Sequence, residues 1–324
     1  MEQVDSCIVC GSQELAGSPA IVAPFVREYA LGGTGQPTAP AQSALMTCAS
    51  CDMVFFDQRY DEEEIAALYA GYRSERYYTI RHRFEPLYTR KLNDVVGRES
   101  EVIDRRKRKV KDLVTSVLGE GVIRSVLDFG GDAGQFIPDI EGADRYVLEV
   151  SDVPPVPGVM SVSHLEDLKE PVDLVMVAHV LEHLSDPVAL LQELTSVSGD
   201  DGHLYVEVPM DRPRMPPAYA ARLQASWVDM VSRSARCTVV ADAVSTPVRV
   251  LARGRWIPFT FPRLHEHINF FSQESLRRAL DLSGWQVVGQ VEYKHRSGLL
   301  AVPVLGMLAH RRVSEGSARV HAAE

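Results

Sequence analysis

A short apolar segment that ends in a glycine-rich turn constrains the fold of this chain most strongly. Residues 125–129 read SVLDF and are followed by Gly130, Gly131 and Gly134. A β-prone run bounded by glycine predicts a strand, and glycines allow both a sharp turn and a close approach of a ligand to the backbone. In an open α/β sheet, this position is the carboxyl end of a central strand, where ligands bind.

A second predicted strand, Arg145–Val150, carries Glu149 near its end, and an acid about 20 residues after Asp128 is placed to bind ribose hydroxyls. Further strands and intervening helices follow along the chain. The strands are expected at Gly158–Val162, Val172–Ala178, His203–Val208 and Trp285–Tyr293, and the helices at Gly134–Glu141 and Pro187–Ser196. Strands that alternate with helices indicate an α/β protein with a mostly parallel sheet.

Four of the five cysteines form two matching pairs, Cys7-x-x-Cys10 and Cys48-x-x-Cys51. Each pair suits a knuckle that supplies two corners of a tetrahedral zinc site, and four thiolates leave no open position for catalysis. We therefore expect a structural zinc ion; the alternative is four unconnected reduced thiols. The remaining Cys237 is expected to be a small buried hydrophobic residue.

The net charge of −10 argues against a general nucleic-acid binder, because neutralising phosphates needs a basic surface. The basic run Arg105–Lys109 is expected to be a solvated helix face, or else a patch for an anionic partner. Met1–Asp5 lacks the features of a secretory signal, and the apolar run Gly298–Ala309 is too short to span a bilayer. A cytoplasmic location with reduced cysteines follows as an expectation, whereas the oligomeric state stays open.

Three regions are expected: a zinc-binding ribbon at 1–58, a helical linker or lid at 59–121, and a Rossmann-like domain at 122–324. The ribbon contains a loop rich in breakers, Gly32–Pro40, and Asp61–Glu64 opens the first helix of the linker. Pro86 is expected to start another helix.

An insertion at 210–264 interrupts the third region after a strand. It contains a predicted amphipathic helix, Ala218–Ala235, with one apolar side made of Tyr219, Leu223, Trp227, Met230 and Val231. This helix either shapes a substrate pocket or serves as a packing or dimer helix.

Two polar clusters are candidates for chemistry. His179, Glu182 and His183 follow a predicted strand and share one face if a helix begins there. His265, Glu266 and His267 place two imidazoles around a carboxylate, so His267 is a candidate base with Glu266 orienting it or the substrate. Alternatively, Glu182 and His183 cap a helix, and the 265–267 segment is a solvated loop before a helix. Ser272 is expected to cap that helix, with Ser275 at its third position.

The segments Leu127–Gly134, Glu149, Val172–His183 and Gly202–Pro209 resemble the successive motifs of class I S-adenosylmethionine-dependent methyltransferases. The resemblance covers about residues 122–292 and implies a Rossmann-like, mostly parallel seven-stranded sheet. The cysteine pairs, Leu68–Tyr72 and Glu266–Ser272 resemble zinc-containing methyltransferases that act on sugars, among them nucleotide-sugar C-methyltransferases.

The resemblance also implies roles for particular residues. The cofactor would contact the first strand and its turn (Asp128, Gly130, Gly131, Asp132 and Gly134), the acid Glu149, the adenine-flanking positions Ser163, His164 and Leu165, and His179 near the methionine end. Glu266 and His267 would deprotonate the acceptor, with His183 as a further candidate, and Tyr72 would enter the same site. Two positions depart from the family pattern. Asp132 stands where small residues are usual and could clash with the cofactor carboxylate or bond its ammonium group. Leu264 replaces an aromatic residue, which puts C-methylation in question but not methyl transfer.

The leading hypothesis is thus a methyltransferase that uses S-adenosylmethionine and acts on a sugar, a nucleotide sugar or a related precursor in polysaccharide or natural-product biosynthesis, at carbon or oxygen. Two alternatives are retained. One is a metal-assisted small-molecule O-methyltransferase whose ligands are His179, Glu182, His183 and one of His265 or His267. The other is a non-catalytic zinc-ribbon binding protein with a degenerate cofactor site.

Overall fold

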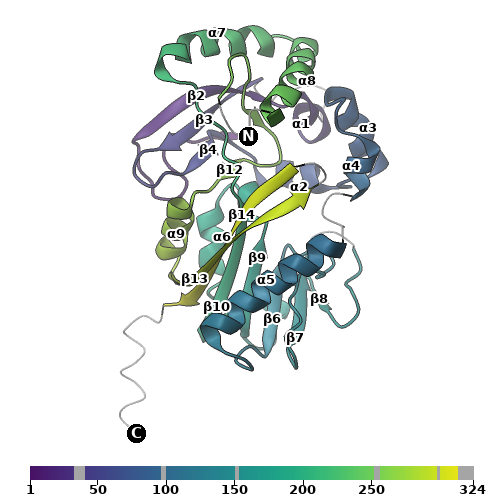
Figure 1. Cartoon of the computed structure of the whole chain (residues 1–324), viewed down its shortest axis with the longest axis vertical. Coiled ribbons are helices and arrows are strands. Elements are labelled where there is room, and N and C mark those ends of the chain that lie inside the picture. Colours follow the sequence, from purple (N-terminus) through teal and green to yellow (C-terminus); the bar gives the residue numbers. More distant parts are fainter. Residues whose placement is uncertain (33–40, 96–99, 150–152, 252–255, 298–299, 313–324) are drawn as a thin grey trace.

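The computed structural model describes residues 1–32, 41–95, 100–149, 153–251, 256–297 and 300–312 (Figure 1). Its central feature is a seven-stranded sheet with the order β13-β14-β10-β9-β6-β7-β8. The strands are β6 (Ser125–Phe129), β7 (Asp144–Leu148), β8 (Met160–Val162), β9 (Val172–Ala178), β10 (Ser198–Pro209), β13 (Trp285–Ser297) and β14 (Leu300–Arg311). Neighbouring strands from β10 to β8 are parallel, and β14 is antiparallel to both β10 and β13. The expected mostly parallel, seven-stranded Rossmann-like sheet is confirmed.

Alternation along the strands divides the core between the two faces of this sheet. In β6, Val126 faces helix α5 (Ser100–Leu118), whereas Leu127 belongs to the core that includes α6 (Pro187–Glu193) and α9 (Gln273–Leu282). Figure 1 shows α5 crossing the sheet. Strand β9 is buried on both faces, which accounts for its nearly continuous apolar sequence.

Strand β14 was not among the expected strands. Its sequence overlaps the apolar run Gly298–Ala309, from which the sequence predicts only that the run is too short for a membrane span. The strand lies between β10 and β13, so both of its edges are paired with a neighbouring strand. No helix among the described residues is long and apolar enough to cross a membrane.

The expected helix at Gly134–Glu141 is wrong, because these residues form turns. Gly134 has a φ of +72°, outside the helical region, and Pro138 lacks the N–H that a helix interior needs.

The basic run at 105–109 also differs from expectation. Arg106 on α5 is only 7% exposed, whereas Arg105, Arg108 and Lys109 are exposed. Arg106 shares the inward face of the helix with Val110 and Leu113, as spacings of four and seven residues require. The run is therefore a solvated face interrupted by one buried guanidinium.

A second sheet has the order β11-β2-β3-β4-β12. It combines β2 (Leu15–Val22), β3 (Gln42–Cys48) and β4 (Val54–Phe56) with β11 (Arg263–Leu264) and β12 (Asn269–Phe270). Strand β1 (Glu2–Gln3) pairs separately with β5 (Gln58–Arg59), and α1 (Pro24–Tyr29) follows β2. Of the expected breaker loop, 33–40 lies outside the described residues. Because β11 and β12 flank residues 265–268, the amino-terminal sheet holds this candidate segment in place.

The linker contains α2 (Glu62–Tyr69), α3 (Glu75–Phe84) and α4 (Arg90–Val95). Asp61 caps α2 through a capping box with Glu64, which agrees with the expected helix start. The helix expected to begin at Pro86 begins instead at Arg90.

The insertion forms two helices, α7 (Ala221–Ser232) and α8 (Ala235–Leu251), after a short 3-10 turn, η3 (Ala218–Ala220). The inward side of α7 comprises Gln224, Val228 and Val231 and packs near β2. Of the residues expected on the apolar side, Val231 is buried, but Tyr219, Leu223 and Met230 are exposed. Cys237 on α8 is exposed as well, so the expectation of a buried thiol is wrong.

Candidate functional site

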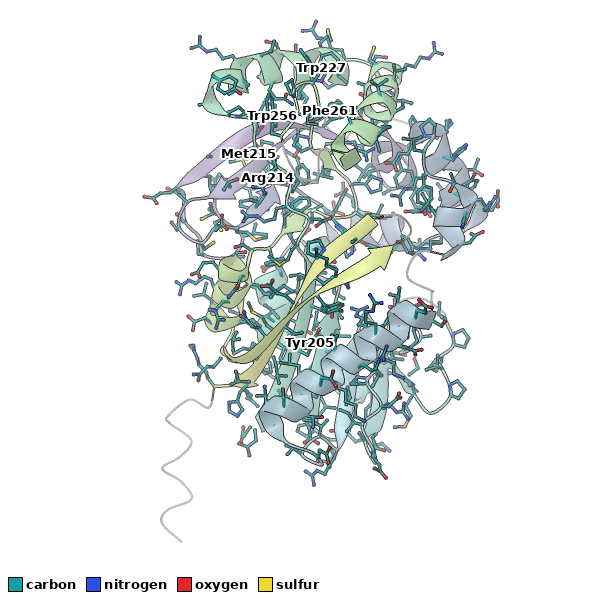
Figure 2. The ribbon with its side chains drawn as sticks, viewed as in Figure 1. Tyr205, Arg214, Met215, Trp227, Trp256 and Phe261 are labelled. Carbon is teal, nitrogen blue, oxygen red and sulfur yellow. The ribbon has the colours of Figure 1, made fainter. Side chains whose placement is uncertain are left out.

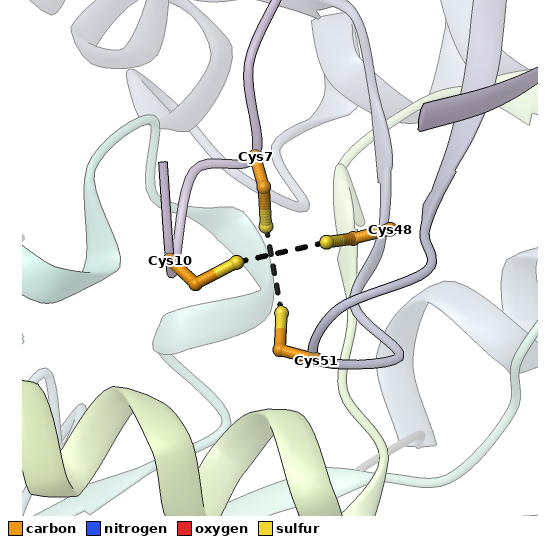
Figure 3. Close-up of side chains that lie close together, drawn as sticks. All are labelled: Cys7, Cys10, Cys48 and Cys51. Atoms are coloured by element: carbon orange, nitrogen blue, oxygen red, sulfur yellow. Dashed lines mark hydrogen bonds between the residues drawn. The ribbon is translucent and has the colours of Figure 1, made fainter. Parts of the chain in front are cut away.

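The four paired cysteines converge on one point (Figure 3). Cys7 Sγ lies 3.5 Å from Cys51 Sγ, and Cys10 Sγ lies 3.6 Å from Cys48 Sγ. Tetrahedral zinc with Zn–S bonds of about 2.3 Å places its sulfurs about 3.8 Å apart. Cys7, Cys48 and Cys51 are buried and Cys10 is partly buried. The cluster therefore has the ligand chemistry and the compactness of a closed structural zinc site.

The turn after β6 forms a cradle made of backbone atoms. Gly130 and Gly134 have φ values of +69° and +72°, which favour glycine. A Cβ on Gly131 would lie 2.3 Å from Asp128 Oδ2, and one on Gly130 would lie 2.7 Å from Val180. No side chain fits at these positions, so the close packing of this turn at the carboxyl edge of the sheet requires glycine.

Asp132 and Glu149 meet at this cradle. The backbone N–H of Asp132 donates to Glu149 Oε2 over 3.0 Å, and Asp132 Oδ2 accepts from Gln135 Nε2 at 3.0 Å. Asp132 has a φ of +55°, a conformation that aspartate tolerates better than most residues. The ribose-binding candidate and the unusual loop acid are thus brought together.

The adenine-flanking candidates lie after the neighbouring edge strand β8. His164 precedes a short 3-10 turn, η1 (Leu165–Asp167), and Asp167 Oδ2 accepts from the backbone N–H groups of Ser163 and His164. Since β7 and β8 are parallel neighbours, Glu149 and His164 follow the same edge of the sheet.

His179 follows β9 with a φ of +59° and is held between two buried carboxylates. Its Nδ1 lies 3.1 Å from Glu182 Oε1 and its Nε2 lies 3.1 Å from Glu207 Oε1. Burial opposes the charged ring, but the hydrogen bonds to Glu182 and Glu207 outweigh it and raise the pKa of His179 to about 9. An imidazolium fixed in this way carries charge to the edge of the cradle and is poorly suited to act as a base.

Sequence reasoning missed the charges behind His179. Arg106 Nε lies 2.7 Å from Glu207 Oε1, and the hydroxyls of Tyr205 and Tyr293 both donate to Glu207 Oε2 at 2.6 Å. Burial alone would raise the pKa of Glu207, yet Arg106 and His179 lower it to about 2. A buried Glu in β10 and a regularly spaced Arg in α5 give no sign of this pairing until the sheet is assembled.

His183, His267 and Glu182 form a second cluster. The expected helix start at His179 is a 3-10 turn, η2 (Leu181–His183), and a ligand atom from each of the three residues lies within 4.8 Å of the others. His183 Nδ1 donates to the Glu266 carbonyl oxygen at 2.9 Å, which leaves Nε2 free to accept. Glu182 is fully buried, and its Oε2 has no hydrogen-bond partner among the described residues.

His267 is partly accessible, with a side chain 37% exposed. Its Nδ1 lies 3.7 Å from Asp211 Oδ2, just beyond the end of β10. Burial lowers the pKa of His267, but Asp211 and Glu182 outweigh burial and raise it overall. Asp211 was not among the sequence candidates, because nothing local connects it with a histidine 56 positions away.

Glu266 contacts different groups from those expected. Its carboxylate accepts from the Tyr77 hydroxyl and from Arg81 Nη1, the latter at 3.3 Å. Against burial, Arg81 and His265 lower the pKa of Glu266 to about 2. His265 Nε2 in turn lies 2.9 Å from Glu85 Oε1. His265 and Glu266 thus belong to one charged network, with His265 Nδ1 3.8 Å from Glu266 Oε2. His267 points away from this network, and Asp211 rather than Glu266 is placed to orient it.

Tyr72 lies beside this network and is 42% exposed. Its ring centroid is 5.8 Å from that of Tyr69 and 5.2 Å from that of Tyr77. Tyr69 also packs edge-to-face on His183, with centroids 5.8 Å apart. Tyr69 and Tyr77 therefore lie beside Tyr72, the one tyrosine that the sequence suggested for this site.

A cavity of about 670 Å³ opens beside His267. This cavity, called the acceptor cavity after the role proposed for it below, is bounded by residues after β10, by α7 and by the segment 256–267. Its wall includes Arg81, Asp211, Arg212, Arg214, Trp256, Phe261, Arg263, Glu266 and His267. Figure 2 shows Arg214, Trp256 and Phe261 gathered beneath α7. A volume of this size is typical of small-molecule sites.

The strand order, with one antiparallel strand inserted in a parallel sheet and a glycine cradle at its carboxyl edge, defines a class I methyltransferase fold. A family model for a methyltransferase domain matches residues 72–290, and the chain belongs to this family.

Comparison with solved structures gives distant matches. The chain is similar to the 1,6-didemethyltoxoflavin-N1-methyltransferase of Burkholderia thailandensis, with 15% identity, a TM-score of 0.45 and coverage of 85% of this chain and 97% of that one. It is also similar to a SAM-dependent methyltransferase from Aquifex aeolicus, with 16% identity, a TM-score of 0.39 and coverage of 68% and 97%. No curated protein matches the sequence.

Proposed function

We propose that this chain transfers a methyl group from S-adenosylmethionine to a small acceptor, with a sugar, nucleotide sugar or related precursor as the substrate class. One observation carries the proposal: the acceptor cavity reaches His267, and His267 adjoins the segment that closes the glycine cradle. Val180 of that segment lies against Gly130, while His183 packs on His267 with ring centroids 4.8 Å apart. Cofactor and acceptor sites would therefore face each other across η2.

The cradle fits the proposed cofactor. Its glycines stand where the methionine portion would bind, Glu149 stands where ribose hydroxyls would bind, and His164 and Leu165 follow the next strand. Gln135 Nε2 donates to Asp132 Oδ2 and so holds the Asp132 side chain in place. In this position Asp132 would pair with the ammonium group of the cofactor rather than clash with the cofactor's carboxylate. When bound, the cofactor supplies a methyl group that is already activated by the sulfonium charge.

The chain's own residues would position the acceptor and remove one proton. His267 would accept the proton from the acceptor oxygen or carbon as that atom forms its bond to the methyl group and the methyl–sulfur bond breaks. Asp211 would stabilise the resulting imidazolium, and His183 and Glu266 are the further candidates for this step. The remaining product would be the neutral thioether, S-adenosylhomocysteine.

Calorimetry with S-adenosylhomocysteine and turnover with a panel of sugar and nucleotide-sugar acceptors test the proposal. The variant His267→Ala should bind S-adenosylhomocysteine within about twofold of the parent but lose at least about 100-fold in turnover, as loss of a general base predicts. The exposed His82 offers a matched control, since His82→Ala should keep both properties. Absence of binding at millimolar concentration would refute the cofactor site and favour the non-catalytic binding protein.

A specific observation supports a second candidate, metal-assisted O-methylation. Glu182, His183 and His267 offer one carboxylate and two imidazoles whose ligand atoms lie within 4.8 Å of one another. Both ring nitrogens of His179 face carboxylates, Glu182 and Glu207, and His265 Nε2 faces Glu85, so this candidate is argued without these two histidines. Turnover that EDTA abolishes and Mg²⁺ or Mn²⁺ restores would favour this candidate. Turnover that persists in metal-free enzyme would leave His267 as the base.

A further inference from the structure

Helix α8 buries several polar residues and exposes several apolar ones. Thr238, Asp242 and Ser245 are buried, at 3%, 6% and 6% exposed, whereas Val240 and Val244 are 63% and 68% exposed. The buried polar groups are satisfied within the fold: Asp242 Oδ2, for example, receives Arg263 Nη1 at 2.7 Å. The helix is thus anchored to the site by polar contacts and presents a valine stripe outward.

This stripe forms one wall of a concave groove. The α7–α8 groove has a volume of about 640 Å³ and is lined by α7, α8 and the segment 257–260. Its main apolar residues are Trp227, Met230, Val240, Val244, Val248 and Phe259. Exposed apolar surface that gathers in one concave place marks a binding site more often than scattered exposed residues do.

The groove continues into the acceptor cavity. Thr260 lines both the groove and the cavity. The surrounding segment places Trp256 and Phe261 in the wall of the cavity, and Ile257 and Phe259 in the wall of the groove. Trp227 and Phe259 pack edge-to-face with centroids 5.4 Å apart, and Figure 2 shows Trp227 directly above Phe261. A single elongated ligand can therefore occupy both sites by crossing Thr260.

The two sites differ sharply in chemistry. The groove is almost wholly apolar, whereas the acceptor cavity is lined by charged groups, among them Arg81, Arg212, Arg214 and Arg263. Three of these arginines already pair with carboxylates: Arg81 with Glu85 and Glu266, Arg212 with Asp52, and Arg263 with Glu85 and Asp242. A guanidinium carries five N–H donors, so such pairs do not use all of them. Guanidinium groups favour phosphate and carboxylate oxygens.

We propose that the acceptor is amphiphilic, with an anionic polar head in the acceptor cavity and a hydrocarbon chain in the α7–α8 groove. This inference rests on the proposed function for the role of the head, while the groove is an independent observation. It narrows the substrate class to a molecule that joins a charged head to a chain, rather than a fully water-soluble sugar derivative.

Calorimetry with octyl phosphate, ethyl phosphate and 1-octanol, below micelle-forming concentrations, tests both halves. Octyl phosphate should bind at least about tenfold more tightly than either ethyl phosphate or 1-octanol, because each buried methylene adds apolar contact. Val244→Asp should remove this advantage without changing ethyl phosphate binding, and Arg214→Gln should weaken both phosphates. Val122→Asp is the matched control, since Val122 is 47% exposed and precedes the far end of β6.

Equal binding of octyl and ethyl phosphate would overturn the proposal, as would equal binding of octyl phosphate and 1-octanol. A parent protein that is dimeric by light scattering and a monomeric Val244→Asp variant would assign the groove to a second copy of this chain instead. Binding of S-adenosylhomocysteine, measured on the same samples, keeps the two ideas apart. If S-adenosylhomocysteine does not bind, methyl transfer is refuted, and the octyl phosphate result alone shows whether the groove binds a hydrocarbon chain.

Discussion

At the scale of single residues, buried acids dominate the carboxyl edge of the central sheet. Glu182 and Glu207 are fully buried, and His179 bridges them. Asp128 is 1% exposed, and its Oδ2 has no hydrogen-bond partner among the described residues. Burial raises the pKa of Asp128 to about 7, although Arg106 opposes the shift. Asp128 therefore holds a proton in the folded state at a pH where an unfolded chain has lost it.

This difference makes stability fall as the pH rises. Between pH 3.8 and about 7 the folded state binds a proton at Asp128 that the unfolded state does not, so the contribution is fully present below this window and lost above it. The slope amounts to at most about 1.4 kcal/mol per pH unit. Denaturant titrations should show a weaker decline for Asp128→Asn than for the parent. The exposed Asp144 supplies the control, because Asp144→Asn should keep the parental slope.

At the scale of elements, one buried arginine ties the β1–β5 pair to both candidate loops. Arg59 on β5 donates through Nη2 to the carbonyl of Leu184 at 2.7 Å and to Asn269 Oδ1 at 2.8 Å. Asn269 Nδ2 donates to the carbonyls of Leu181 and Leu184, both at 2.7 Å. The turn η2 and strand β12 are thereby fixed relative to each other, which places His183 beside His267.

Replacing Arg59 should lower the free energy of unfolding. Arg59→Lys keeps the charge but cannot reach the same acceptors, so we expect a loss of about 3 kcal/mol in the free energy of unfolding. Arg124→Lys should change stability by less than about 0.5 kcal/mol, because the Arg124 side chain is 83% exposed. Chemical denaturation of both variants measures the difference. If the two variants were equally stable, the hydrogen bonds of Arg59 would contribute no net stabilisation.

At the scale of the whole molecule, the cysteine cluster and the central sheet share one hydrophobic core. Cys7, Cys48 and Phe55 belong to the same buried cluster as Leu276 and Trp285. A metal ion held by the four thiolates would therefore support the sheet as well as the ribbon.

Metal removal should accordingly destabilise the entire chain. We expect one zinc ion per chain by elemental analysis, and chelation should lower a single thermal transition by at least about 5 °C. Cys48→Ser should lower the zinc content and the transition temperature, while Cys237→Ser should leave both unchanged. A separate low-temperature transition after chelation, with the main transition unmoved, would show that the ribbon unfolds independently.

The sequence by itself determined the features that depend on local patterns. Four cysteines at matched spacings, the strand and glycine turn at 125–134, and the apolar β9 are recognisable because spacing and alternation act over a few residues. The same locality accounts for the errors: an apolar run alone does not reveal that β14 lies between two strands, and one buried arginine is hidden within a basic run.

The tertiary structure decided which groups face one another. The pairing of Arg106 with Glu207, the approach of Asp211 to His267 and the contact of Arg81 with Glu266 each join residues from separate elements. Such contacts depend on sheet order and helix placement, and desolvation then sets their charge states. For this chain, local patterns define the fold class and the metal ligands, whereas long-range packing defines the arrangement of the proposed site.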